Sequence, residues 1–298
     1  MPFLNLVRWK NLLILFATLF ITAFLTLQPY FNFTIFAFYA ASVIFIAAAG
    51  YALNDFFDVE IDAINKPEKL IAGKLIPLKY VLIFAVILYI LGIVSALLLS
   101  NLMHQWISFV ILLFAAMVTI SYASFFKKKL IWGNVAVAFT AAAPVLLPWI
   151  FVKILSGNYS ENRFLNHVIT ATFIFAWLMH FAREIVKDIE DINGDKELNC
   201  RSIPIVFNQK TTIIAIRILI SITVLISIAV ALALYKMQLF FTATYLILLI
   251  TIPAVYLIKR ISAIFYIKEA RFAGNFIKLM MLTGLLTLVV LYFEMNHL

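Results

Sequence analysis

Four carboxylates and an asparagine come directly after a long apolar stretch, in a segment that we call the first acidic segment (residues 54–62). It reads Asn54-Asp55-Phe56-Phe57-Asp58-Val59-Glu60-Ile61-Asp62 and follows an apolar run that begins near residue 33. If the helix continues past that run, Asn54, Asp58 and Asp62 recur every fourth residue and share one face. Like charges at this spacing repel one another, so we expect a cation among them. Carboxylate and amide oxygens suit Mg2+, and the segment therefore predicts a magnesium site.

A second acidic segment, residues 180–195, repeats this arrangement later in the chain. Its spacings of four, four, three and four predict one helical face with a histidine and four carboxylates: His180, Glu184, Asp188, Asp191 and Asp195. We expect Gly194 to end or loosen this helix. Two carboxylate faces that meet across a helical bundle can hold two divalent ions, and such ions would bridge and neutralise a diphosphate.

Basic residues could supply further diphosphate contacts. Tyr122 is followed by Lys127, Lys128 and Lys129, and the loop after the first acidic segment contains Lys69. Lysine binds phosphate as a point charge, so these residues, with Tyr122, are candidates for the diphosphate. An anchor on the positively charged side of a membrane explains the lysine triplet equally well. His180 is either a general base for an acceptor or a satisfied buried histidine.

The elements that must position these residues are membrane helices. Hydrophobic residues make up 65% of the 298 and charged residues only 12%, which is too little polar surface for a soluble globule of this size. A span needs roughly 20 apolar residues. The chain contains nine such runs, near residues 11–28, 33–54, 80–100, 105–125, 131–152, 167–186, 212–235, 238–258 and 274–293. We therefore predict an all-α bundle of nine transmembrane helices in one domain, residues 1–298.

The basic residues orient this bundle. With nine spans, 20 of the 23 lysines and arginines fall on the alternate flanks that begin with the N-terminus. Because basic residues concentrate on the cytoplasmic side, we expect the N-terminus and both acidic segments to be cytoplasmic and the C-terminus to be outside. Each acidic segment precedes a polar loop and three more spans, which indicates two four-helix halves, spans two to five and six to nine, plus an extra first span.

Other classes of function fit less well. The formal charge of +9 is spread over short loops rather than gathered on one soluble face, so no nucleic-acid partner is expected. The single cysteine, Cys200, excludes an intrachain disulfide. An ion or metabolite transporter would place charges near the midplane between inverted repeats. Here the carboxylates cluster on one side and the apparent repeats run parallel. No protein partner is deducible.

The two acidic segments resemble the paired signatures of the UbiA-type intramembrane prenyltransferases. Asn54-Asp55-x-x-Asp58-x-x-x-Asp62, followed by Asn65-x-Pro67 and Gly73, is similar to the first, and Asp191-x-x-x-Asp195 is similar to the second. The resemblance implies Mg2+-dependent transfer of a polyprenyl group from its diphosphate to an acceptor at the membrane. It also implies a metal site whose ligands are Asn54, Asp58, Asp62, Asp191 and Asp195, with Asp55 and Asp188 in support. Of these, the resemblance makes four central to catalysis: Asp58, Asp62, Asp191 and Asp195.

The acceptor is less defined by the motifs. The residue sequence of the second signature most resembles the archaeal-type digeranylgeranylglyceryl phosphate synthase branch, which implies a prenylated glycerol phosphate as acceptor. Branches that act on quinone, haem or chlorophyll precursors share the metal motifs, so an aromatic acceptor is the alternative. Lys69 and Leu70 stand where many members have arginine and proline, and lysine cannot make the planar fork of arginine.

Overall fold

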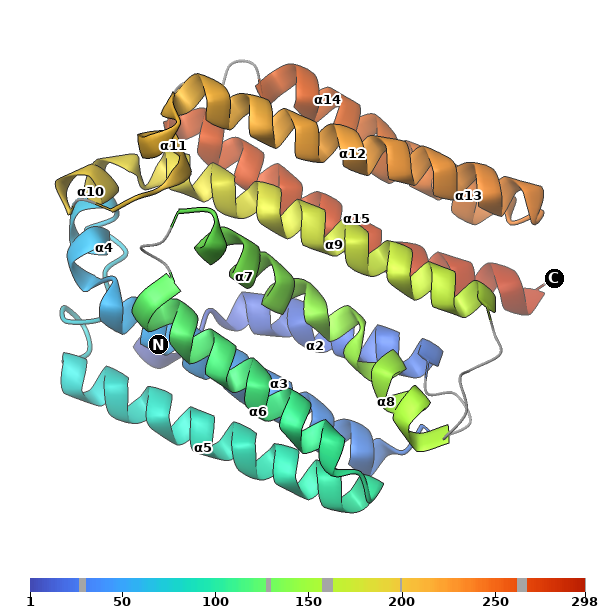
Figure 1. The fold of residues 1–298 in the computed structure, drawn as a ribbon, viewed down its shortest axis with the longest axis horizontal. Coiled ribbons are helices and arrows are strands. Elements are labelled where there is room, and N and C mark those ends of the chain that lie inside the picture. Colours follow the sequence, from blue (N-terminus) through green and yellow to red (C-terminus); the bar gives the residue numbers. More distant parts are fainter. Residues whose placement is uncertain (27–30, 127–129, 157–162, 199, 262–266, 298) are drawn as a thin grey trace. The chain divides into compact units, whose positions relative to one another are not determined.

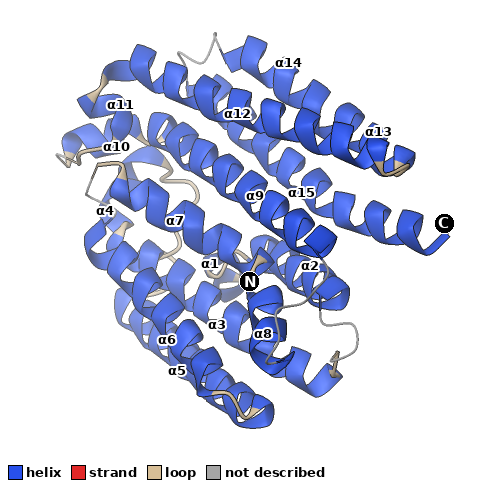
Figure 2. Cartoon of the chain, turned by 45° about the vertical axis from the view of Figure 1, so that its right-hand side comes forward, coloured by secondary structure: helices blue, strands red, loops and turns tan. Residues whose placement is uncertain are grey.

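The fold is entirely helical, as predicted. The computed structural model describes residues 1–26, 31–126, 130–156, 163–198, 200–261 and 267–297. Within these ranges the chain forms helices joined by turns, with one isolated bridge between Ala72 and Ile76 and no β-strand (Figure 2). In a bilayer the helix satisfies every backbone polar group within one segment, which is why so apolar a chain takes this form.

Eight helical segments in the described part are long and apolar enough to cross a membrane, which makes this an integral membrane protein. They are α2 (Trp9–Thr26), α3 (Phe33–Phe57), α5 (Leu78–Met103), α6 (Trp106–Ser121) with its continuation to Ser124, α9 (Arg163–Glu190), α12 (Asn208–Lys236), the segment Phe240–Ile261 made of α13 (Phe240–Leu246), a π-helical turn (Ile247–Thr251) and α14 (Ile252–Ile261), and α15 (Ile267–His297).

The remaining predicted span, residues 131–152, is divided. The structure forms α7 (Trp132–Ala142), a 3-10 turn (Ala143–Val145) and α8 (Leu147–Ser156). Pro144 lies in the turn and Pro148 in the first turn of α8, where a proline that lacks an N–H and clashes with the preceding turn is tolerated. Neither helix is long enough to span a bilayer alone, but together they cover the roughly 20 residues that a span needs.

The chain divides into two compact units. Their stretches of sequence can be found by residue number on the colour bar of Figure 1. The first contains residues 1–136, 144–162 and 193–200, and the second contains residues 137–143, 163–192 and 201–298. This division corresponds broadly to the two halves expected from the acidic segments, with three differences. The first unit includes the first span and the end of the second acidic segment, and residues 137–143 of the fifth predicted span belong to the second unit. The first unit also contains the short helices α1 (Pro2–Leu6), α4 (Val59–Asn65) and nearly all of α10 (Ile192–Glu197).

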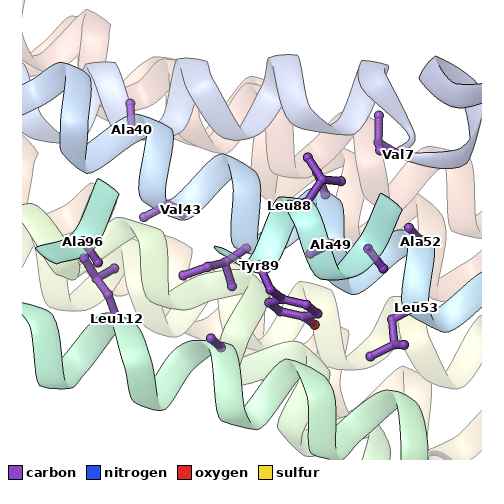
Figure 3. Close-up of a cluster of buried hydrophobic side chains, with 14 of the residues drawn as sticks. Val7, Ala40, Val43, Ala49, Ala52, Leu53, Leu88, Tyr89, Ala96 and Leu112 are labelled. Carbon is purple, nitrogen blue, oxygen red and sulfur yellow. The ribbon is translucent and has the colours of Figure 1, made fainter. Parts of the chain in front are cut away.

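In the first unit, α3 packs closely along α5. A methyl group on Gly92 of α5 would come 3.2 Å from the backbone N of Ile46 and 3.3 Å from the backbone O of Ser42 on α3, so only glycine allows this approach. Small residues promote helix contacts of this kind in membranes, where hydrophobicity cannot drive association. Figure 3 shows the buried core that results, with Ala49 of α3 beside Leu88 and Tyr89 of α5.

In the second unit, α9 packs against α12 and α15. A carboxylate from α15 lies at the start of α13. Glu294 accepts hydrogen bonds from the backbone N–H groups of Phe241 and Thr242, each at 2.8 Å. These N–H groups have no partner inside α13, so Glu294 acts as its N-terminal cap. Ser227 and Thr251 share a hydrogen bond of 2.9 Å beside the π-helical turn before Pro253.

Candidate active site

The first acidic segment is the junction of α3 and α4. The backbone N–H of Asp58 donates to the carbonyl of Asn54 at 2.9 Å, and that of Asp62 donates to the carbonyl of Asp58 at 2.8 Å. The helical hydrogen bonds therefore continue through Asp58, although its φ of −93° and ψ of 4° bend the path there. Asn54, Asp58 and Asp62 are each one turn apart, as their spacing predicts. We call these three residues the oxygen ladder.

The middle of the oxygen ladder is buried. Asp58 is 4% exposed, whereas Asn54 and Asp62 are partly exposed. The side-chain amide of Asn54 donates from Nδ2 to Oδ2 of Asp58, so its Oδ1 takes no part in this bond. A buried carboxylate is expected to be paired or to coordinate a metal. The side-chain atoms of the oxygen ladder that could bind a metal are all oxygens. They fit a hard ion such as Mg2+ rather than zinc, which prefers nitrogen and sulfur ligands.

Asp55 is paired with a residue that the sequence reasoning missed. Arg8 lies between α1 and α2 and donates from Nη2 to Oδ1 of Asp55 at 2.8 Å, while its guanidinium lies 5.1 Å from the ring centre of Tyr51. Partial burial alone would lower the pKa of Arg8, but Asp55, Tyr51 and Asp62 together outweigh this effect and the pKa is raised. Arg8 thus stays charged and neutralises Asp55 beside the oxygen ladder. The partners are 47 residues apart, and no local pattern announces the pair.

The second acidic segment bends earlier than predicted. Instead of ending at Gly194, α9 ends at Glu190, and Gly194 lies inside α10. Asp191 occupies the turn between the two helices, and its N–H still donates to the carbonyl of Lys187 at 2.9 Å. The glycine does not end the helix; it allows a close contact with Asn65 of α4. Asp188 and Asp191 belong to the second unit, and Asp195, which is 8% exposed, belongs to the first.

Cations already balance one member of the predicted acidic face of α9. Lys187 donates to Oε1 of Glu184, and Nη1 of Arg183 lies 3.5 Å from the same oxygen. Glu184 is therefore a structural partner of these cations. His180, one turn earlier, is partly exposed.

The N-terminal half of α10 and the C-terminal end of α4 meet within the first unit. The backbone N–H of Gly194 donates to Oδ1 of Asn65 at 2.9 Å, across 129 residues of sequence. Asn65 is three residues after Asp62, and Asp195 follows Gly194. The structure thus brings the end of the second acidic segment against the helix that carries Asp62.

The candidate diphosphate contacts lie at three places. Tyr122 begins a π-helical turn, Tyr122–Phe126, that packs against α3. A methyl group on Gly50 of α3 would lie 3.5 Å from Cβ of Thr119 on α6. Because α3 and α6 run parallel, Tyr122, one turn after Thr119, is level with Asn54, one turn after Gly50. Lys69 is exposed, in a loop that Lys74 closes by donating from Nζ to the carbonyl of Pro67 at 2.9 Å. Lys127 and Lys128 lie outside the described residues.

No group of three histidine, cysteine, aspartate or glutamate side chains is close enough to hold a metal ion among the residues that the structure describes. The three-residue oxygen ladder contains only two carboxylates, and Asp188 and Asp191 belong to the other unit. The seven-residue metal site therefore stays a prediction.

Comparison with known proteins decides the family. The model of the UbiA prenyltransferase family matches residues 14–292. The chain belongs to the UbiA prenyltransferase family. Family members share the fold as well: a UbiA homologue from Archaeoglobus fulgidus, solved with DMAPP and Mg2+ bound, has a TM-score of 0.65 at 15% identity, over 97% of this chain and all (100%) of that one.

Among UbiA family members, this chain is similar to proteins named digeranylgeranylglyceryl phosphate synthase. The one from Methanococcus maripaludis is 30% identical over 280 residues, which are 93% of this chain and 92% of that protein. The one from Pyrococcus horikoshii is 37% identical over 169 residues, or 56% of this chain. In that match the chain spans 55% of the length of its relative.

Proposed function

We propose that this chain transfers a polyprenyl group from its diphosphate to a membrane-associated acceptor and releases diphosphate. The observation that carries the proposal is the oxygen ladder: a buried Asp58 between Asn54 and Asp62, at the end of an apolar helix, in a member of the UbiA family. A buried carboxylate at the edge of a bilayer is costly, and such residues are functional by default.

We assign Mg2+ to this site, and two ions, because two acidic segments supply oxygen donors. The ions, when bound, would neutralise the diphosphate as it leaves. The residues that would hold them are Asn54, Asp58, Asp62, Asp191 and Asp195, with Asp55 and Asp188 in support. That the A. fulgidus homologue was solved with DMAPP and Mg2+ supports this assignment.

The remaining roles follow from charge and from exclusion of water. Lys69, Lys127 and Lys128 would attract the diphosphate, and the hydroxyl of Tyr122 would donate to it. The allylic group becomes electron-poor as its bond to diphosphate breaks, and water would consume it. The apolar spans α3, α5 and α6 keep bulk water from this step, and the prenyl chain lies among apolar side chains or lipid.

We place the N-terminus and the site on the cytoplasmic side and the C-terminus outside. The distribution of basic residues supports this orientation. It also requires residues 131–156 to cross the membrane once, since eight spans would put both termini on the same side. A reporter domain fused to each terminus tests it: opposite locations support the orientation, and a common location contradicts it.

We propose a glyceryl phosphate lipid that already carries a geranylgeranyl group as the acceptor. The names of the two relatives support this choice. The test supplies radiolabelled geranylgeranyl diphosphate, Mg2+ and one acceptor at a time to the protein in bilayer discs. We expect label to appear in a lipid product with geranylgeranylglyceryl phosphate and not with hydroxybenzoate or naphthoate. Transfer to an aromatic acceptor alone would contradict the choice of a glyceryl phosphate lipid as acceptor. Absence of transfer to every acceptor would contradict the proposed prenyl transfer.

A further inference from the structure

A direct contact between α4 and α10 joins the two acidic segments. Oδ1 of Asn65 accepts the backbone N–H of Gly194 at 2.9 Å, in a partly buried position. Near the N-terminal end of a helix the N–H groups have no intrahelical partner, so a side chain from elsewhere must satisfy them. Asn65 supplies that acceptor from the last turn of α4.

The contact is close enough to require glycine. A methyl group at Gly194 would lie 2.6 Å from Nδ2 of Asn65 and 3.1 Å from the backbone O of Ile61. The asparagine side chain could move only by giving up its bond to Gly194, and the carbonyl of buried Ile61 belongs to the helix backbone. The two helices therefore meet backbone to side chain, without room for a larger residue.

Each end of this contact is next to a carboxylate of the proposed site. The N–H of Lys66 donates to the carbonyl of Asp62 at 2.9 Å, which closes the turn that carries Asn65. On the other side of the contact, the N–H of Cys200, which follows α10, donates to the carbonyl of Asp195 at 2.8 Å. A shift of either helix would move its carboxylate relative to the other.

We propose that Asn65 and Gly194 are positioning residues that hold Asp195 against the turn of Asp62, so that both acidic segments serve one metal site. The inference rests on the proposed function, because it assumes that the two segments share their ions. Neither residue needs to touch the metal or the substrate. Groups that orient metal ligands typically change metal affinity or activity by about 10- to 100-fold when they are removed.

The test compares Asn65→Leu, which keeps the size but loses the acceptor, with Asn65→Asp, which keeps an acceptor oxygen. Asn32→Leu is the matched control, because Oδ1 of Asn32 also accepts a backbone N–H, from Thr34 at 2.8 Å, at the other end of α3. Mn2+, which shares the oxygen preference of Mg2+, reports binding by electron paramagnetic resonance without any need for turnover. Hydrogen exchange of residues 192–198 reports whether the contact has opened.

We expect Asn65→Leu to speed exchange and to weaken Mn2+ binding by about 10- to 100-fold. Asn65→Asp should restore both towards the values of the unaltered chain, and Asn32→Leu should lower only the thermal stability. Gly194→Ala should resemble Asn65→Leu. Unchanged Mn2+ binding in Asn65→Leu would overturn the inference, as would equal weakening in Asn32→Leu. Failure of the proposed function looks different: the unaltered chain would bind Mn2+ and respond to these substitutions but transfer no prenyl group.

Discussion

Arg8 and Asp55 form an ion pair of 2.8 Å between Nη2 and Oδ1, and it fixes the junction of α1 and α2 to the helix that carries the oxygen ladder. Asp55 is 15% exposed at its side chain and Arg8 is 37% exposed. Asp55 is adjacent to Asn54, so Arg8 offsets a negative charge beside the ladder. Removing one partner of such a pair costs more than removing both.

Replacement of Arg8 tests this relationship. Arg8→Gln should destabilise the protein by about 1–3 kcal/mol, because Asp55 loses a hydrogen bond between charged groups. Arg8→Gln combined with Asp55→Asn should be less destabilised than Arg8→Gln alone, with a coupling energy of about 0.5–3 kcal/mol. Unfolding of the single and double variants in detergent measures both values. Strictly additive effects would show that the pair is not coupled.

Asp58 and Glu60 give a matched comparison within one acidic segment. Asp58 is buried in the oxygen ladder, whereas Glu60 is exposed and off that face. Asp58→Asn should lower prenyl transfer by at least about 100-fold, which corresponds to roughly 2.7 kcal/mol of lost transition-state stabilisation. Glu60→Gln should leave transfer unchanged. The measurement is the initial rate at saturating Mg2+, and equal rates for the two variants would rule out a special role for the ladder.

The lysines after the fourth span separate a substrate contact from a membrane anchor. Lys127→Gln and Lys128→Gln should raise the KM for prenyl diphosphate by about 10- to 100-fold if each contacts the diphosphate, since a hydrogen bond to a charged group contributes about 1.5–3 kcal/mol. Lys236→Gln, at the exposed end of α12, is the control. If KM stays the same while the orientation in the membrane changes, the triplet is an anchor.

Glu294 provides a stability prediction away from the site. Because both carboxylate oxygens accept backbone N–H groups at the start of α13, Glu294→Gln should destabilise the protein by about 1–2 kcal/mol. The Mg2+ requirement should stay the same, since Glu294 lies near the C-terminal end of α15 and belongs to neither acidic segment. Asn296→Ala, which removes an exposed bond within α15, serves as the control. A changed Mg2+ requirement in Glu294→Gln would contradict a purely structural role.

Local periodicity was sufficient to predict the oxygen ladder and most of the helices. Hydrogen bonds link residues four apart, so the spacing of Asn54, Asp58 and Asp62 determines their stacking without knowledge of the rest of the fold. The length of an apolar run likewise determines whether it can span a bilayer. The same reasoning located both acidic segments at helix ends.

Contacts between distant residues were not accessible to this reasoning. Arg8 is one of the basic residues that the charge pattern places on the cytoplasmic flank before the first span, and its partner is 47 residues away. The local pattern predicts that Gly194 ends or loosens a helix, but it lies inside α10, and only a glycine leaves space for Asn65, 129 residues earlier. In both cases tertiary packing, rather than local propensity, selects the residue.

We propose above that the two acidic segments supply the ligands of one magnesium and diphosphate site, and one set of variants tests this most directly. Transfer from labelled prenyl diphosphate should be measured for the unaltered chain, Asp58→Asn, Asp191→Asn and the double variant, each checked for membrane insertion. Residues that act as a unit are not additive. We predict that each single substitution lowers the rate by at least about 100-fold and that the double variant is no slower than the worse single one. Normal transfer by either single variant, or losses that multiply in the double variant, would contradict the claim.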